Sequence, residues 1–179
     1  MRQVYLDDHS SNMVVTGNVL TDQLGNGLDM HAGSNNTVSN NVIFGGRVTM
    51  ANDTAVGFFD GRHNMTNNRL ERNVIIVQDP ASVVLAGRPG LLRNESGDAD
   101  TAVLSVRRNI YWSPSHALGQ SGRLFMNRSW ASWRAMGMDT GSFVDRDPGF
   151  VDAAGGDWRL RGDALAHDIG FEALAVPFC

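Results

Sequence analysis

Two short motifs recur along this chain of 179 residues, and the distance between their copies limits the folds that it can adopt. Leu6-Asp7-Asp8-His9 returns as Leu28-Asp29-Met30-His31 and, in altered form, as Phe59-Asp60-Gly61-Arg62. An asparagine followed by an apolar pair comes after each copy and appears once more further along: Asn18, Asn41, Asn73 and Asn109. These asparagines are 23, 32 and 36 residues apart. Self-similarity at a period of roughly 20–50 residues is typical of a solenoid or another repeat array.

The composition excludes several classes of protein. A net charge of −4, with 42% hydrophobic and 19% charged residues, is ordinary for a globular protein and provides no basic field for nucleic acid. No apolar run reaches the roughly 18–20 residues that a membrane span needs. The single cysteine, Cys179, has no partner for an internal disulfide. We therefore expect neither nucleic acid nor a membrane as a partner.

Short apolar runs rich in valine and isoleucine favour strands over helices between Met1 and Trp112. The connections between these runs are too short for crossover helices, which argues against a doubly wound sheet. Several short strands per repeat predict an all-β fold, a parallel β-helix, in which equivalent residues of successive coils stack about 4.8 Å apart. The four repeated asparagines then form an inward-facing ladder with a structural role.

The segment around two tryptophans predicts a helix. Ser129 precedes this segment as a serine N-cap, and Gly137 follows it as a stop signal. Trp130 and Trp133 are three residues apart and share one face of such a helix. We expect them to cover the open end of the coils, and a sugar-stacking platform is the alternative.

The tail beyond this helix predicts a turn at 147–152 and a final strand at 156–160. We therefore expect a single domain, with parallel β-helix coils over 1–112 and a capping segment of the same domain, a short helix and strand, over 113–179.

Six segments from both halves of the chain carry a family resemblance: Tyr5-Leu6-Asp7-Asp8, Gly17-Asn18-Val19, Asn40-Asn41-Val42-Ile43, Asn109-Ile110-Tyr111-Trp112, Asp147-Pro148-Gly149-Phe150-Val151-Asp152 and Gly156-Asp157-Trp158-Arg159-Leu160. Together they resemble the C-terminal part of bacterial right-handed parallel β-helix repeat proteins, in the pectin-lyase-like superfamily. The resemblance implies a right-handed coil, complex carbohydrate as the substrate class, and an extracellular or periplasmic location, although the chain carries no signal peptide.

Members of this superfamily include glycoside hydrolases, polysaccharide lyases, pectin esterases and epimerases, and also non-catalytic binding proteins. The fold therefore names a substrate class and no reaction, which must come from the site. The leading hypothesis is a glycoside hydrolase that acts on a plant or microbial polysaccharide. A carbohydrate-binding module or scaffold without turnover is the alternative, because catalytic members usually have more coils. A cation-dependent polysaccharide lyase is the third.

The Asp-x-His repeats supply the candidate site. Alternate residues of a strand point to the same side, so each aspartate and the residue two positions later share a face. If equivalent coils lie in register, one column holds Asp7, Asp29 and Asp60, and the next column holds His9, His31 and Arg62. We expect Asp29 to act as nucleophile or base and Asp7 or Asp60 as acid. The residues of the second column would bind or polarise substrate.

Two other interpretations of these acids stay open. Aspartates at repeated turns often bond local backbone amides and have no further role. The three acids could also hold Ca²⁺ or another divalent cation through their oxygens, and with His9 and His31 a transition metal. A lyase would pair such a cation with Arg62 as the basic group. The hydrolase hypothesis requires no cofactor.

The start of the chain leads directly into the first repeat, and solenoids normally cover their first coil. We expect either a longer protein or a partner that covers this end. A second copy of the chain could be that partner, which makes a homo-oligomer through the N-terminal coil a further expectation.

Overall fold

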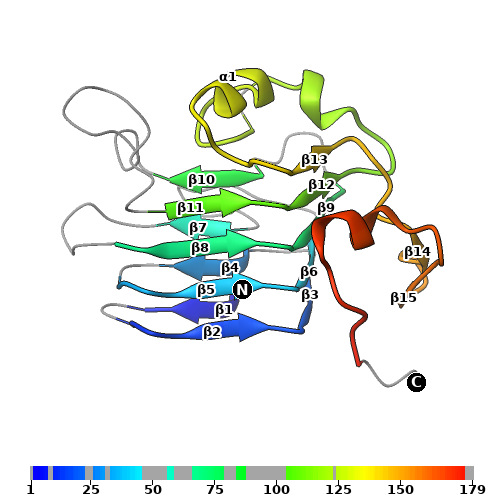
Figure 1. Ribbon diagram of the computed structural model, residues 1–179, viewed down its shortest axis with the longest axis horizontal. Coiled ribbons are helices and arrows are strands. Elements are labelled where there is room, and N and C mark those ends of the chain that lie inside the picture. Colours follow the sequence, from blue (N-terminus) through cyan, green and yellow to red (C-terminus); the bar gives the residue numbers. More distant parts are fainter. Residues whose placement is uncertain are drawn as a thin grey trace.

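The computed structural model describes residues 2–7, 10–22, 26–30, 33–45, 56–58, 66–78, 84–87, 104–122 and 124–175 (Figure 1). These residues are mostly β, with parallel sheets and one α-helix, which is compatible with the predicted all-β class. Within the same ranges no helix has the length and apolar character that crossing a membrane requires.

Three parallel sheets make up most of the structure. The first contains β1 (Arg2–Leu6), β4 (Asn26–Met30), β7 (Val56–Phe58) and β10 (Leu85–Gly87). The second contains β2 (Val14–Thr16), β5 (Thr37–Ser39), β8 (Asn68–Glu71) and β11 (Leu104–Arg107). The third contains β3 (Val19–Asp22), β6 (Val42–Gly45), β9 (Val74–Val77), β12 (Ile110–Trp112) and β13 (Phe143–Val144). The chain passes through the first, second and third sheets in that order and then returns to the first. Each pass adds one strand beside the strand of the previous pass in each sheet (Figure 1).

The asparagine ladder is confirmed. The Nδ2 group of Asn18 donates to Oδ1 of Asn41 at 2.9 Å, Asn41 to Asn73 at 3.0 Å, and Asn73 to Asn109 at 3.1 Å. Each ladder residue directly follows a residue with positive φ that turns the chain from the second sheet into the third: Gly17, Asn40, Arg72 and Arg108. The side-chain amide closes this turn, because a short polar side chain can bond the backbone on both sides of it.

A second ladder was not predicted. The backbone N–H of Asn36 donates to Oδ1 of Asn68 at 3.0 Å, and the N–H of Met13 donates to Oδ1 of Asn36 at the same distance. Asn36 and Asn68 are fully buried; Asn36 directly precedes β5 and Asn68 is the first residue of β8, so they fix the turns that lead into the second sheet.

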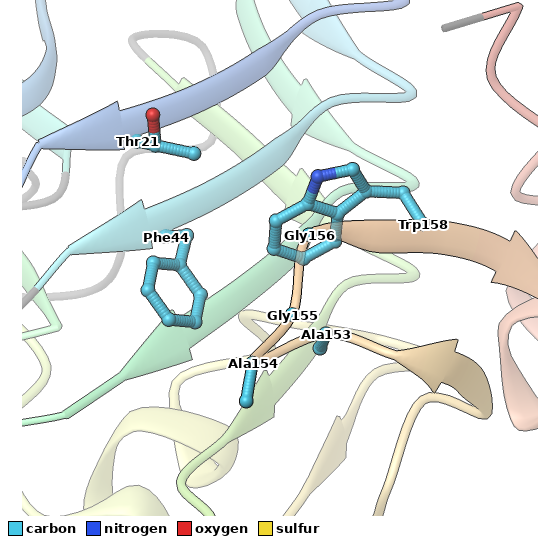
Figure 2. A pocket seen from close by; sticks show the side chains of 7 residues that line it. All are labelled: Thr21, Phe44, Ala153, Ala154, Gly155, Gly156 and Trp158. Carbon is cyan, nitrogen blue, oxygen red and sulfur yellow. The ribbon is translucent and has the colours of Figure 1, made fainter. Parts of the chain in front are cut away.

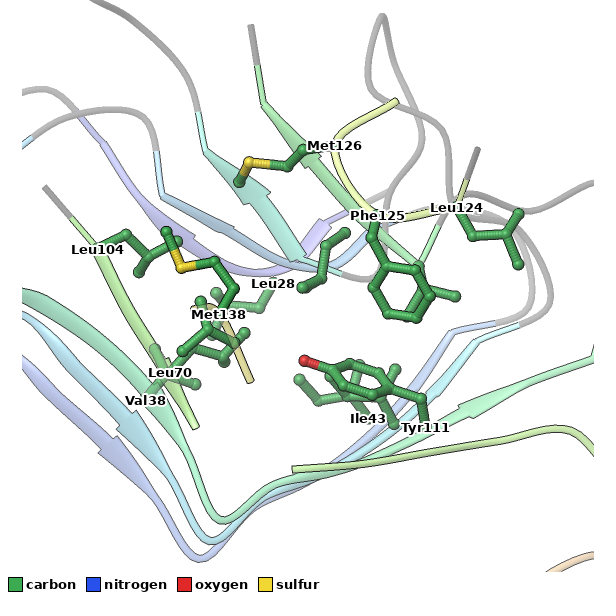
Figure 3. Packing of buried hydrophobic residues seen from close by; sticks show 14 of the residues in the cluster. Leu28, Val38, Ile43, Leu70, Leu104, Tyr111, Leu124, Phe125, Met126 and Met138 are labelled. Atoms are coloured by element: carbon green, nitrogen blue, oxygen red, sulfur yellow. The ribbon is translucent and has the colours of Figure 1, made fainter. Parts of the chain in front are cut away.

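The apolar core receives side chains from all three sheets. Leu28 from the first, Val38 from the second and Ile43 from the third are each 0% exposed and belong to one cluster (Figure 3). This burial explains why β-branched and leucine residues alternate with polar ones in the strands of the second sheet.

The third sheet is buried on its other face as well. Phe44 and Val74 belong to a second apolar cluster together with Phe150, Trp158 and Phe171 from the tail. The tail consists here of β14 (Phe150–Asp152), β15 (Asp157–Leu160) and the 3-10 helix η2 (Leu165–Ile169). A strand that is covered on both faces reads as a continuous apolar run, as in β9.

The predicted helix is confirmed as α1 (Trp130–Ala135), which follows the 3-10 helix η1 (Leu118–Gln120). Its N-cap Ser129 accepts a hydrogen bond from the N–H of Ser132 at 3.2 Å. Trp133 is 0% exposed within the core cluster, and Trp130 packs half-buried against it. The helix lies beyond the last strands of the stack (Figure 1), so the covering role predicted for Trp133 is confirmed and a sugar platform on this side chain is wrong.

Candidate functional site

Asp29 lies on the outer face of the first sheet. Leu28 and Met30 of β4 are core residues, and Leu6 of β1 is also buried in the core. Because successive side chains alternate between faces, Asp29 points to the opposite side, as does Tyr5. This parity agrees for Asp29 with the prediction that the aspartates face away from the core, but the exposure to solvent that the prediction implied is wrong, because Asp29 is 0% exposed.

The predicted register of the acids is wrong. Asp29 pairs with Tyr5 of β1 and with Gly57 of β7, whereas the prediction placed it beside Asp7 and Asp60. The alignment of the two Leu-Asp motifs requires a step of 22 residues, and the strands take a step of 24, with Val4 opposite Leu28. Both steps keep the core residues inside, since only a one-residue slip exchanges the faces of a strand. The hydrophobic pattern therefore could not choose between them.

Asp7 and Asp29 differ in their surroundings. Asp7 is exposed just beyond β1, where its backbone oxygen accepts a hydrogen bond from the N–H of Ser10 at 3.0 Å. Asp29 is 0% exposed. From the strand spacing and a two-residue offset along the strand, their Cα atoms are about 8 Å apart on a diagonal of the sheet. The two acids are thus neighbours without being stacked.

The other four candidates, Asp60, His9, His31 and Arg62, lie outside the described residues. The column that was predicted to bind substrate is therefore not placed. In the part of the chain that the structure describes, no three His, Cys, Asp or Glu side chains come together as metal ligands would. The Ca²⁺ hypothesis for Asp7, Asp29 and Asp60 stays a prediction, because one of its three ligands is not placed.

Tyr5 of β1 lies on the same outer face of the first sheet as Asp29. Its side chain is 36% exposed, and it lies directly beside Asp29 in the register of β1 and β4. The partly exposed phenol offers an apolar ring face, and the exposed carboxylate of Asp7 offers hydrogen-bond acceptors, whereas the carboxylate of Asp29 is buried. Tyr5 was not predicted as a site residue, because the predicted register placed it two residues along the strand from the column of acids.

Asp139 forms a second polar cluster that sequence reasoning missed. Its carboxylate is 0% exposed and accepts hydrogen bonds from the Tyr111 hydroxyl at 3.0 Å, from Nε1 of Trp133 at 2.5 Å and from the Ser142 hydroxyl at 2.6 Å. Burial raises the pKa of the Asp139 carboxyl, although these donors pull it in the opposite direction. Burial, followed by the charge of Asp139, raises the pKa of the Tyr111 hydroxyl well above 10.0.

This cluster has a structural role. It joins β12 through Tyr111 to helix α1 through Trp133, and Nδ2 of Asn109 reaches the same carboxylate at 3.4 Å. Asp139 and Tyr111 are both fully buried, so a substrate has no access to them. A lone acid between a predicted helix and a predicted turn gave no sequence signal for this arrangement.

Comparison of the chain with family models, with curated proteins and with solved structures finds no match. The resemblance to parallel β-helix repeat proteins therefore depends on the sequence segments given above.

Proposed function

We propose that this chain is a right-handed parallel β-helix that binds a polysaccharide along the outer face of its first sheet. Three observations support the architecture. The chain visits the first, second and third sheets in turn, all strand pairs within these sheets are parallel, and the register steps of the second and third sheets follow the spacing of the asparagine ladder. The family resemblance of the sequence supplies the handedness, the carbohydrate ligand and the extracellular or periplasmic location.

The observation that carries the proposed ligand is the pair formed by the partly exposed Tyr5 and the exposed Asp7, beside which Asp29 is buried. A sugar ring has an apolar face of C–H groups and a rim of hydroxyl groups. The ring of Tyr5 suits the apolar face, and a carboxylate accepts hydrogen bonds from hydroxyl groups through two oxygens. A polymer that passes over β1 meets Tyr5 and, just beyond the strand, Asp7.

The burial of Asp29 favours binding over hydrolysis. A nucleophile or general base must touch the substrate or a water beside it, and a side chain that is 0% exposed does not. Hydrolysis by Asp7 and Asp29 is the second candidate, because the two acids are neighbours on adjacent strands. The distance between their carboxyl groups would then decide the stereochemistry, since these groups are roughly 5–5.5 Å apart in retaining and roughly 6.5–9.5 Å apart in inverting glycosidases.

Affinity electrophoresis in gels that contain single polysaccharides tests the binding proposal. We expect a neutral or acidic plant or microbial polysaccharide to retard the protein, and we expect Tyr5→Ala to abolish the retardation. Thr16→Ala, at an exposed position of the second sheet, is the matched control and should leave it unchanged. Equal retardation of the parent protein and Tyr5→Ala on every polysaccharide would contradict the proposal.

Turnover separates the two candidates. A binding module releases no reducing ends from the polysaccharide that retards it. A hydrolase releases them, loses this activity in Asp7→Asn and in Asp29→Asn, and gives a product whose anomeric configuration NMR detects. Because Asp29 is buried, the melting temperature of Asp29→Asn must accompany its activity. A lyase would instead give an unsaturated product that absorbs in the ultraviolet and would stop when its cation is chelated.

A further inference from the structure

A hollow of about 380 Å³ lies on the far side of the third sheet from the core. Thr21 of β3 and Phe44 of β6 form one wall, and Trp158 of β15 with the Ala153–Gly156 turn forms the other (Figure 2). Its volume is within the range of about 300–1,000 Å³ that small-molecule sites occupy. It belongs to a different sheet from Tyr5 and Asp29.

The turn between β14 and β15 keeps this hollow open. Oδ1 of Asp152 accepts a hydrogen bond from the N–H of Gly155 at 2.9 Å, and a Cβ on Gly155 would stand 2.3 Å from Oδ2 of the same residue. Gly156 has a φ of +83°, which side-chain-bearing residues rarely adopt. The turn therefore favours glycine at Gly156, and a side chain at Gly155 would displace the Asp152 carboxylate; neither glycine presents a side chain to the hollow.

The aromatic wall is held rigidly. The Trp158 ring contacts Phe44 edge to face with centroids 5.6 Å apart, and it contacts Phe150 in the same way at 5.4 Å. Trp158 is 8% exposed and Phe44 9%, so both rings are fixed by packing before any ligand arrives. A preformed wall lowers the entropic cost of binding.

Two hydrogen-bonding groups of this hollow are unused. Among the described residues, none accepts a hydrogen bond from Nε1 of Trp158, and none bonds the hydroxyl of the exposed Thr21. Figure 2 shows the nitrogen edge of the Trp158 ring on the side of the strand that carries Thr21; in this view the Thr21 methyl points toward the ring and its hydroxyl points away, and rotation about χ1 to another staggered rotamer turns the hydroxyl toward the hollow. The remaining lining consists of Phe44, two alanines and two glycines, with no charged side chain.

We propose that this hollow binds one ring of a neutral sugar. The Trp158 N–H donates to a hydroxyl oxygen of the sugar, the Thr21 hydroxyl donates to or accepts from a second hydroxyl, and the alanine and phenylalanine surfaces contact its C–H groups. A uronate or another anion finds no cation here. A purely apolar ligand leaves both polar groups without a partner, which costs affinity.

NMR of the four tryptophan indole N–H groups tests this proposal in the intact chain. Trp158→Phe keeps the aromatic contacts and identifies the Trp158 signal by its loss. We expect titration with neutral monosaccharides (glucose, galactose, rhamnose and N-acetylglucosamine) to shift that signal with at least one of them. Galacturonate should not shift it. The Trp130 signal, identified by Trp130→Phe, should stay in place throughout.

Removal of one hydrogen bond at a time gives the size of the effect. We expect Thr21→Val and Trp158→Phe each to weaken binding of that sugar about 3- to 10-fold by saturation-transfer NMR, since a net hydrogen bond has about this value. Thr16→Val, an equally exposed change on the second sheet, should have no effect. Thr21→Trp places a large side chain at the mouth of the hollow and should abolish binding.

Two outcomes would overturn the proposal: no sugar of the panel shifts the Trp158 signal, or the binding survives both Thr21→Val and Trp158→Phe. The proposed polysaccharide face is tested separately, because Tyr5→Ala should leave the Trp158 shift unchanged. If Tyr5→Ala removes both the retardation by the polysaccharide and the binding of the monosaccharide, and Trp158→Phe removes neither, the sugar binds at the first sheet and this hollow is not a site.

Discussion

The asparagine ladder makes a quantitative prediction about stability, because its members have the same chemistry and different numbers of bonds. Asn73 is 0% exposed, and its Nδ2 group donates to the backbone oxygens of Val38 and Glu71, each at 3.0 Å, and to Oδ1 of Asn109. Its own Oδ1 accepts from the backbone N–H and the side-chain amide of Asn41. Asn73→Ala removes all five bonds and leaves the buried backbone N–H of Asn41 without an acceptor.

The expected cost follows from these bonds. A buried N–H without a partner costs about 1–3 kcal/mol, and each lost hydrogen bond contributes about 0.5–1.5 kcal/mol net. Allowing for relaxation of the turn, we expect Asn73→Ala to lower the free energy of unfolding by about 3–5 kcal/mol. Asn18 donates from Nδ2 to only two acceptors, the backbone oxygen of Thr16 and Oδ1 of Asn41, at the partly exposed first turn. For Asn18→Ala we expect about 1 kcal/mol.

Urea unfolding followed by far-ultraviolet circular dichroism and by tryptophan fluorescence measures both values. With a slope of about 2 kcal/mol/M, Asn73→Ala should lower the midpoint by roughly 1.5–2.5 M and Asn18→Ala by roughly 0.5 M. Asn73→Asp keeps an acceptor for Asn41 but places a carboxylate against the three oxygens that accepted from Nδ2, so it should destabilise at least as much as Asn73→Ala. Equal losses for Asn18→Ala and Asn73→Ala would refute the idea that the ladder stabilises the interior turns.

Three further predictions concern other parts of the chain. Asp139→Asn should lower the free energy of unfolding by about 1–3 kcal/mol, because it turns an amide N–H₂ toward buried donors. Burial raises the pKa of Asp139 above 3.8, so the parent protein loses the stabilising contribution of this group as the pH rises through that raised pKa. The difference in stability between the parent protein and Asp139→Asn in chemical unfolding should therefore shrink from pH 3 upward. Gly33→Ala should destabilise by at least about 2 kcal/mol more than Gly137→Ala in thermal unfolding, because both have positive φ but only at Gly33 would a Cβ stand 1.9 Å from a backbone oxygen, that of Ser10. If the chain associates through its first coil, light scattering should show a mass that rises with concentration, and Val14→Lys on the edge strand β2 should abolish the rise.

The sequence predicted those features that repeat at a fixed position in every coil. The ladder residues Asn18, Asn41, Asn73 and Asn109 each stand before an apolar pair, so the pattern survives changes in loop length. The ladder of Asn36 and Asn68 escaped notice because Met13 occupies the matching place in the first coil and supplies only its backbone N–H. A feature that needs a side chain in only two coils is too short to recognise as periodic.

The register of the first sheet shows where such reasoning ends. The ladder advances by 23 residues from the first coil to the second, and an odd step in the first sheet would exchange core and surface residues. The register step between the first two strands of this sheet must therefore be 22 or 24 residues. The similarity of the two Leu-Asp motifs favoured a step of 22. The structure takes 24, because Val4 and Leu6 fill the places opposite Leu28 and Met30. Only the packing of the coil, which the sequence does not display, decides between two steps of equal parity.

The cover of the third sheet could not be predicted for a different reason. Phe44 and Val74 gave a sequence signal for burial on both faces, but their partners Phe150, Trp158 and Phe171 come from a segment more than 70 residues away. Nothing in the local pattern of either segment identifies the other. The hollow beside Trp158 is a by-product of this long-range contact, so it too lies beyond sequence reasoning.

The ladder also has a direction, and this bears on what can dock at the first coil. Each rung donates from its backbone N–H and its Nδ2 toward the next coil and accepts from the coil before it. At the far end the backbone N–H of Asn109 donates to the Ser142 hydroxyl at 2.8 Å, so the last rung has its acceptor. At the near end no described residue donates to Oδ1 of Asn18.

A surface that covers the first coil therefore gains most by presenting N–H donors beside Asn18. A further coil of the same kind does so, because its ladder residue would donate as Asn18 itself donates to Asn41. A second copy that is related by a two-fold axis brings its own Asn18 Oδ1 to the same place, and two acceptors without a shared proton repel each other. Addition of β-strands that continue the existing ladder is thus favoured over symmetric pairing of two first coils. Any self-association through Val14 must keep the Asn18 Oδ1 atoms of the two copies from facing each other.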